Sequence, residues 1–153
     1  GDGPDRTTYE KLIRHYRLKE HVLLGRWRDD LESFYKLFDL YVMSSNHEGW
    51  GRTVIEAMAS GVSVVMTDVG LAGEIIKTEE NGMVAPVGDY RAIAAVIIDL
   101  WRHPERRLKL KDAALKTIQQ LEPRTEQAYL GEYKKALECC QIKSPSTDSS
   151  SRA

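Results

Sequence analysis

The sequence predicts an α/β domain in which helices flank a parallel sheet. Short β-branched runs alternate with helical stretches along the chain, and such alternation is typical of βαβ units with right-handed crossovers. The strongest run, VSVVMT at 62–67, is apolar without alternation, as expected for a parallel strand that is buried on both faces. The 153 residues, of which 42% are hydrophobic, are enough for one domain with a core of its own.

Capping and breaking residues set the expected ends of each element. Asp5 is expected to cap the first helix, and Asp29 or Asp30 the second. Gly61 ends the third helix, and Pro104 opens a later one at its first turn. In chain order, the predicted elements are a helix at 7–18, a strand at 21–24, a helix from 29 or 30 to 38, a strand at 40–43, a helix at 52–60, a strand at 62–67, a loop with a short helix at 69–77, a turn at 81–82, a strand at 83–85 and helices at 89–101, 104–121 and 125–142.

Residues 1–142 are therefore predicted to form one domain, and the low-complexity tail at 143–153 is predicted to be disordered. The charge balance gives no general reason to expect a nucleic-acid partner. Lys and Arg number 22 and Asp and Glu 23, for a formal net charge of −1, whereas nucleic-acid binding usually demands a basic excess.

No apolar run reaches the roughly 20 residues of a membrane span. The adjacent Cys139 and Cys140 predict reduced thiols and a cytoplasmic location. Clustered ligand residues with metal-binding spacing are missing from the sequence, which predicts that no metal is bound.

The loops after 24, 43 and 67 are expected to lie together, because ligands of parallel sheets bind beyond the carboxyl ends of the strands. The second loop leads into EGWGRTVIEA at 48–57. Gly49 and Gly51 allow a tight turn before a helix, whose first free amides attract a phosphate. Glu48 and Glu56 would repel phosphate but accept hydrogen bonds from hydroxyl groups. One ligand meets both demands, a sugar joined to a nucleoside by a diphosphate; a plain surface role for Glu56 stays open.

Four nearby side chains have two interpretations each. Arg52 either offsets phosphate charge or is solvated, and His47 either reaches the sugar or lies on the surface. Trp50 either stacks on the ligand or packs against the sheet. Glu74 either caps a helix or makes a second ribose contact.

Several blocks of the chain closely resemble one enzyme family. SSNHEGWGRTVIEAMASGVSVVMTDVGLAGEII at 44–76 and NGMVAPVGD at 81–89 resemble the C-terminal, donor-binding domain of the family-four retaining glycosyltransferases (glycosyl transferases group 1). The opening GDGP, VLLGRW at 22–27 and AIAAVIIDLWRHPERRLKL at 92–110 fit that domain in the same order. The resemblance includes the E-x7-E signature, Glu48 to Glu56. It implies a Rossmann-like parallel sheet flanked by helices, the C-terminal half of a GT-B fold, truncated at its N-terminal side.

The resemblance also implies a role for each matching position. Glu48 would be the catalytic residue, contacting hydroxyls of the donor sugar near its reacting carbon, and Glu56 would bind the ribose. The other implied positions act at the donor through their backbone: Gly49, Trp50 and Gly51 at the sugar, Arg52 and Thr53 at the diphosphate, and Arg26 and Trp27 at the nucleobase.

By this resemblance, the complete enzyme would transfer a hexosyl group from a nucleotide diphosphate sugar, such as a UDP- or GDP-hexose, to a hydroxyl acceptor with retention of configuration. No cofactor is implied beyond this donor substrate. The acceptor, a glycan or a lipid-linked sugar, would bind through the absent N-terminal domain, so the chain alone is expected to be inactive. The alternatives are a GT-B sugar-nucleotide epimerase and a non-catalytic α/β binding domain.

The basic segment RHPERRLKLK at 102–111 leaves peripheral association with the inner face of a membrane open. The chain also departs from the family pattern. An Arg and a Lys that neutralise the donor diphosphate in the family would precede GDGP and are absent here. The PS before the signature is Ser44-Ser45, and the usual glycine and proline of the DVGGxPE loop are Leu71 and Gly73. These changes are expected to alter the loop beside the sugar.

Overall fold

The computed structural model describes residues 2–121. The chain separates into two units, Gly1–Ile118 and Gln119–Ala153, and the sheet lies in the first of them. The helix predicted at 125–142 and the disordered tail predicted at 143–153 lie outside the described residues.

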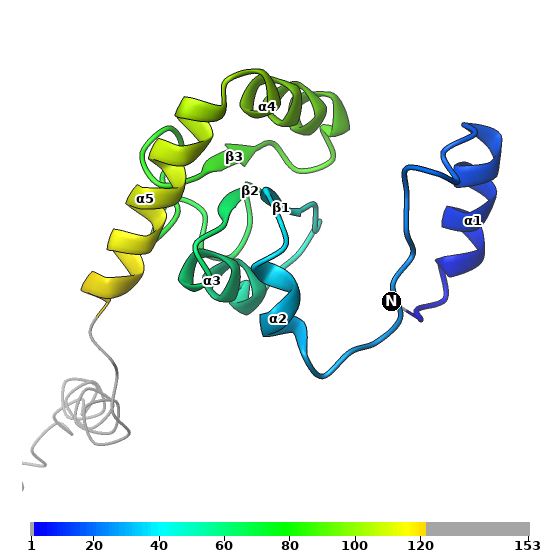
Figure 1. Ribbon diagram of the computed structural model, residues 1–153, viewed down its shortest axis with the longest axis horizontal. Helices are drawn as coiled ribbons and strands as arrows, with labels where there is room; N and C mark the ends of the chain where they lie inside the picture. The colour runs from blue at the N-terminus through cyan, green and yellow to red at the C-terminus, as the bar shows by residue number, and fades with distance from the viewer. Residues whose placement is uncertain (1, 122–153) are drawn as a thin grey trace, which may run out of the picture. The chain divides into compact units, whose positions relative to one another are not determined.

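Within residues 2–121, three parallel strands form the sheet (Figure 1). They are β1 (Leu40–Met43), β2 (Ser63–Thr67) and β3 (Met83–Ala85), hydrogen-bonded in the order β1-β2-β3. The predicted strands at 40–43, 62–67 and 83–85 are thereby confirmed to within one residue at each end. The predicted parallel sheet is confirmed as well.

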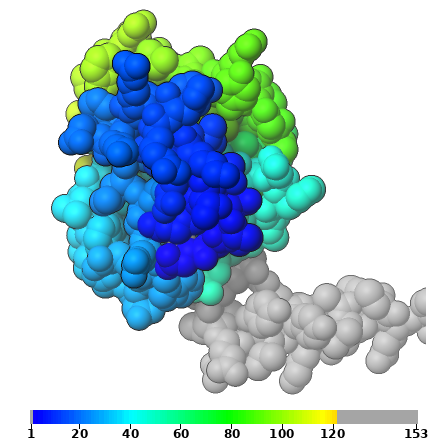
Figure 2. Space-filling view, turned by 90° about the vertical axis from the view of Figure 1, so that its right-hand side faces the viewer, coloured from blue at the N-terminus to red at the C-terminus, as the bar shows by residue number. Residues whose placement is uncertain are grey.

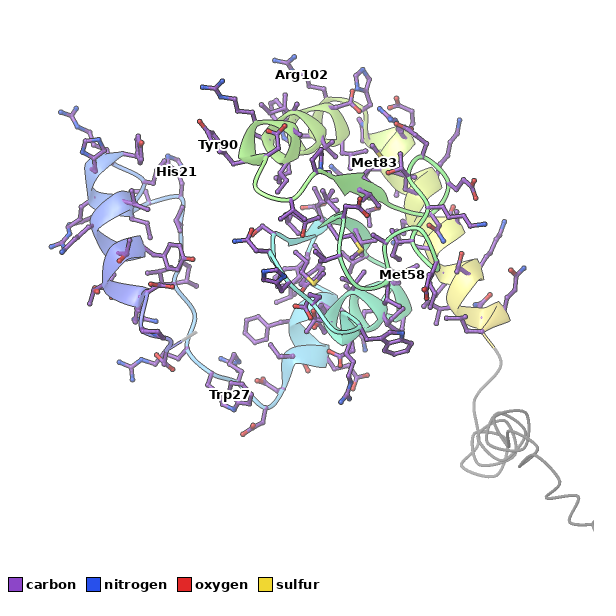
Figure 3. The ribbon with its side chains drawn as sticks, turned by 180° about the vertical axis from the view of Figure 1, so that it is seen from behind. His21, Trp27, Met58, Met83, Tyr90 and Arg102 are labelled. Carbon is purple, nitrogen blue, oxygen red and sulfur yellow. The ribbon has the colours of Figure 1, made fainter. Side chains whose placement is uncertain are left out.

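One face of the sheet is covered by α3 (Arg52–Ala59). Met58 of this helix is fully buried and packs in one core cluster with Val64 and Met66 of β2. Met58 is labelled in Figure 3. Because successive strand residues point to opposite faces, Val65 must face the other side.

The opposite face is covered by α4 (Tyr90–Arg102) and the first part of α5 (Pro104–Gln120). Leu100 and Leu110, one from each helix, are buried in a second core cluster with Val65 of β2. All five residues of β2 are buried. The unbroken apolar run that predicted this strand is thus explained by helices on both of its faces.

Helix α4 begins one residue after the predicted start at residue 89, and Asp89 caps it. The side chain of Asp89 accepts hydrogen bonds from the backbone amides of Arg91 at 3.1 Å and Ala92 at 2.9 Å. These amides belong to the first turn of the helix, where no carbonyl of the helix itself can reach them.

Helix α5 lies at the amino end of the strands. The hydroxyl of Ser63, the first residue of β2, donates to the backbone oxygen of Arg107 in α5 at 2.7 Å. Ser63 is 1% exposed, so this bond satisfies a buried hydroxyl. The strands therefore end at the other edge of the sheet, away from Arg107 of α5.

The prediction of a strand at 21–24 is wrong. This segment has no regular structure, and Leu23 is 92% exposed. An extended segment becomes a stable strand only when a neighbour completes its backbone hydrogen bonds. No strand pairs with this segment anywhere in residues 2–121.

The first two helices are shorter than the sequence predicts. Helix α1 spans Arg6–His15 and α2 spans Leu31–Tyr35. Arg17 has φ of 57°, a left-handed conformation that cannot continue an α-helix. Asp5 and Asp30 occupy the N-cap positions of α1 and α2, as predicted, but neither side chain makes a capping hydrogen bond. No residue of α1 is buried, and Figure 2 shows its dark blue surface facing the viewer.

The short helix predicted within 69–77 does not form. Gly70 has φ of 55° and Gly73 has φ of 81°, whereas a helix needs φ near −63°. The loop is held instead by Leu71 and Ile76, which are both fully buried. Glu74 is exposed and begins no helix, so its predicted capping role is wrong.

The turn predicted at Asn81-Gly82 is confirmed, and Asn81 secures it. The Asn81 side chain accepts from the Lys77 amide at 2.8 Å and donates to the Ile75 carbonyl at 2.8 Å. It also donates to the hydroxyl of Thr117 in α5 at 2.9 Å. Because Asn81 is only 6% exposed, these bonds tie the turn to α5 inside the protein.

Candidate functional site

The entry to α3 is an open helix N-terminus. Gly51 occupies the N-cap position with φ of 87° and is buried, a conformation that glycine adopts without strain. The backbone amide of Val54 bonds to the Gly51 oxygen at 3.0 Å. The amides of Arg52 and Thr53 have no partner inside the helix, by the geometry of any α-helix. These two amides can therefore bind an anion at the positive end of the helix dipole.

Glu48 lies on the exposed loop just before these amides. Its carboxylate accepts a hydrogen bond from the hydroxyl of Ser45 at 3.1 Å. The backbone of Ser45 is in turn held by Thr67, whose hydroxyl donates to the Ser45 oxygen at 2.6 Å. Thr67 is the last residue of β2, so the loop that carries Glu48 is anchored to the carboxyl end of the sheet.

A second loop packs directly on the first. A Cβ atom added to Gly70 would lie 2.9 Å from the backbone oxygen of Trp50 and 3.3 Å from the Cβ of Glu48. Only a residue without a side chain fits there. Gly70 is thus a site-forming residue that sequence analysis missed, although the glycines of DVGLAGE were a visible signal.

The two departures in that loop have physical consequences. Leu71, in place of the family's usual glycine, is fully buried in the core. Gly73, in place of the usual proline, has φ of 81°, which proline with its φ near −65° cannot adopt. The loop beside Glu48 and Trp50 therefore has a backbone conformation at Gly73 that a proline at this position would not allow.

Glu56 lies one turn inside α3 and faces α2. Its Oε2 accepts a hydrogen bond from the Tyr35 hydroxyl at 3.0 Å. Burial, together with this hydrogen bond to Glu56, raises the pKa of Tyr35 well above its usual range, so the phenol keeps its proton and acts as a donor. Glu56 is half-buried and lines an open cleft of about 530 Å³ between the two helices. Glu56 is therefore partly ordered rather than a free surface acid.

The remaining predicted residues at this loop differ in exposure. Trp50 is 54% exposed, which leaves much of its ring available to a ligand. Arg52 is exposed and forms no ion pair within residues 2–121. Thr53 is half-buried beside Met43. His47 is exposed.

The residues predicted at the nucleobase make no described contact with the Glu48–Glu56 segment. The backbone amide of Trp27 donates to Asp2 at 3.1 Å, and its indole N–H donates to Asp29 at 3.1 Å. Figure 3 shows Trp27 on the segment that joins α1 and α2. Trp27 is 80% exposed and Arg26 is exposed. Base binding by these residues remains a prediction.

The basic segment at 102–111 is partly neutralised. Arg106 forms ion pairs with Asp99 and Glu79, and Arg107 pairs with Asp39 at 3.3 Å. The segment thus presents less free positive charge than its sequence indicates. In the part of the chain that the structure describes, no helix is long and apolar enough to cross a bilayer, and no three metal-ligating side chains gather.

A family profile described as "Glycosyl transferases group 1" matches residues 1–117. The chain belongs to this family. Among curated relatives, a lipopolysaccharide core biosynthesis glycosyltransferase, LpsE, of Rhizobium meliloti (strain 1021) is 30% identical over 118 residues, which are 77% of this chain and 35% of that protein. The putative glycosyltransferase EpsD of Bacillus subtilis (strain 168) is 34% identical over 117 residues, or 76% of this chain and 31% of that protein.

Comparison with solved structures supports the same fold. Sucrose-phosphate synthase from Thermosynechococcus elongatus superposes with a TM-score of 0.76 at 27% identity, over 91% of this chain and 36% of that one. The fold of this group 1 glycosyltransferase chain is therefore that of a Rossmann-like GT-B domain, as the sequence predicts. The chain spans about a third of the length of the curated relatives that it matches.

Proposed function

We propose that this chain is the donor-binding domain of a hexosyltransferase that uses a nucleotide diphosphate sugar and retains the configuration of the transferred sugar. The proposal rests on one structural arrangement. The open amides at the start of α3 lie between two carboxylates in the sequence, with Glu48 before them and Glu56 after them. Helix amides suit a phosphate, whereas carboxylates suit neutral hydroxyl groups. A sugar diphosphate nucleotide offers both kinds of group in one molecule.

In the proposed complex, Glu48 accepts from hydroxyls of the transferred sugar, with the backbone of Gly49 and Gly51 alongside. The amides of Arg52 and Thr53 hold the diphosphate, and the exposed Arg52 side chain adds positive charge. The backbone at Arg26 and Trp27 borders the base, and Glu56 binds the ribose. No group beyond this donor is required as a cofactor.

In the proposed reaction, the bond between the anomeric carbon and the diphosphate oxygen breaks. The acceptor hydroxyl oxygen forms the new bond on the same face, and the departing phosphate takes the hydroxyl proton. Glu48 is expected to act by holding the sugar near its reacting carbon. Interactions that are stronger in the transition state than in the ground state accelerate the reaction.

The test is Glu48→Ala in the complete enzyme, supplied with a UDP- or GDP-hexose and an acceptor. We expect kcat/KM to fall by about 100-fold or more, the scale on which loss of one preorganised polar group acts. Glu80→Ala is the matched control, because Glu80 is an exposed acid outside the loop and helix that carry the signature. Turnover near that of the wild type in Glu48→Ala would remove this residue from the catalytic role.

The donor-binding part of the proposal has its own test. Glu56→Ala should weaken donor binding by about 1–3 kcal/mol, the usual cost of leaving a polar partner unmatched. Unchanged affinity would make Glu56 a structural acid.

Product analysis by NMR decides the reaction type. A product with the donor's anomeric configuration supports retention, and an inverted product contradicts it. A changed sugar nucleotide without transfer to the acceptor would instead indicate an epimerase. Donor binding without any turnover would indicate a binding domain.

A further inference from the structure

Tyr35 is a buried polar residue directed at the proposed ribose site. It is the last residue of α2, and only 4% of its surface is exposed. Its ring packs edge-on against Phe38, with centroids 6.2 Å apart, and against Tyr41, with centroids 5.7 Å apart. The ring is thus fixed by its neighbours, and its hydroxyl has little freedom to move.

The Tyr35 hydroxyl donates to Oε2 of Glu56 at 3.0 Å. Within residues 2–121 this is the one hydrogen bond of that hydroxyl, and Oε1 of Glu56 accepts none. A glutamate side chain is flexible and loses considerable rotamer freedom when it is held in one position. A fixed donor on one carboxylate oxygen therefore orients the other oxygen before a ligand arrives.

We propose that Tyr35 is a positioning residue for donor recognition, which holds the Glu56 carboxylate so that its second oxygen accepts from the ribose hydroxyls. This inference rests on the proposed function. It adds that nucleotide affinity depends on a residue of α2 that does not itself touch the nucleotide. The benefit is preorganisation, since a group that is already oriented loses less entropy on binding.

A purely structural role for Tyr35 is the competing explanation, because the same hydrogen bond joins α2 to α3. The two explanations differ in ribose discrimination. A positioning residue affects only ligands that carry the hydroxyls which Glu56 binds. A structural residue affects every nucleotide to a similar extent.

The experiment titrates the purified chain calorimetrically with UDP and with 2′,3′-dideoxy-UDP, and with the guanosine pair if GDP binds more tightly. We expect the wild type to prefer the ribonucleotide by about 10-fold or more, as for a hydrogen bond to a charged group. Tyr35→Phe should cut this preference by about 3- to 10-fold, the net effect of one hydrogen bond, and leave the affinity for the dideoxynucleotide unchanged. Tyr41→Phe is the matched control and should retain the full preference, because its hydroxyl forms no hydrogen bond within the described residues.

A double-mutant comparison sharpens the result. In a Glu56→Ala background, which removes the acceptor of the Tyr35 hydroxyl, adding Tyr35→Phe should change the ribose preference no further. An unchanged preference in Tyr35→Phe, or an equal loss for both nucleotides, would overturn the positioning role while leaving the proposed function intact. Failure of the wild type to bind UDP or GDP would overturn the proposed function, and the inference with it. Binding without any ribose preference would remove Glu56 from the ribose site.

Discussion

Gly70 offers the most direct test of how the candidate site is built, because its backbone is packed against the backbone that precedes α3. The perturbation is Gly70→Ala, and Gly73→Ala in the same loop is its control. Both glycines have positive φ, 55° and 81°, so alanine at either position must adopt the left-handed region at a cost of about 1–2 kcal/mol. Alanine also reduces the entropy of the unfolded chain to a similar extent at both positions.

The two positions differ in the space around them. A Cβ on Gly70 would lie 2.9 Å from the backbone oxygen of Trp50 and 3.1 Å from its carbonyl carbon, whereas a Cβ on Gly73 meets nothing within 4 Å. Overpacking of this kind costs about 1–3 kcal/mol. We therefore expect Gly70→Ala to destabilise the protein by about 2–5 kcal/mol, the sum of the two terms, and Gly73→Ala by about 1–2 kcal/mol.

The assay is urea denaturation of the purified protein, followed by circular dichroism, with the slope of the transition used to check that both variants unfold in the same way. Nucleotide affinity provides a second readout. The clash with Trp50 should displace the loop before α3, so Gly70→Ala should bind UDP or GDP more weakly at temperatures where it is still folded. Equal unfolding free energies for the two variants would refute the argument that the loops are in contact.

Three further predictions concern stability. Asn81→Leu removes three hydrogen bonds of a buried side chain and leaves their partners unpaired. It should lower the unfolding free energy measured by urea denaturation by about 2–4 kcal/mol. Asn46→Leu, at an exposed position, is the control and should change stability little. Asp89→Ala removes the cap of α4 and should lower the unfolding free energy by about 1 kcal/mol; no loss would contradict the capping geometry. The raised pKa of Tyr35 gives stability that is fully present below pH ~10 and is lost as the pH rises, because the phenol then ionises more readily in the unfolded chain. The stability advantage of the wild type over Tyr35→Phe should accordingly shrink by up to about 1.4 kcal/mol per pH unit above pH 10. A constant stability advantage up to pH 11 would contradict the raised pKa of Tyr35.

The sheet was predictable because its signals are local. The β2 run is apolar without interruption, and Gly61 and Asp68 bound it closely. Asp89 marks the start of α4 by a short-range interaction between a side chain and nearby amides. Such features depend on a few adjacent residues, so sequence patterns capture them.

The wrong predictions concern segments whose conformation depends on distant parts of the chain. The segment at 21–24 has strand-forming residues but no neighbouring strand within the described residues. The loop at 69–77 contains helix-compatible residues, but its two left-handed glycines and the burial of Leu71 impose another path. Neither the packing of Gly70 on Trp50 nor the hydrogen bond from Tyr35 to Glu56 has a local sequence signal, because each joins residues about 20 positions apart.

The candidate site could be proposed from the sequence for a different reason. Glu48, Gly51 and Glu56 lie within one short segment, and the rules of helix termini predict an anion site there without knowledge of the fold. The structure adds what anchors them, namely Thr67 beneath the Ser45 loop and Tyr35 against Glu56.

The central claim is that a nucleotide diphosphate binds at the entry to α3, with its diphosphate on the helix amides and its ribose at Glu56. The most direct measurement is a titration of the ¹⁵N-labelled chain with UDP and GDP, followed by amide chemical shifts in NMR spectra. We predict saturable shifts that are largest at Gly51, Arg52 and Thr53 and that need higher nucleotide concentrations in Glu56→Ala. Shifts confined to other segments, or no shifts with either nucleotide, would contradict the claim.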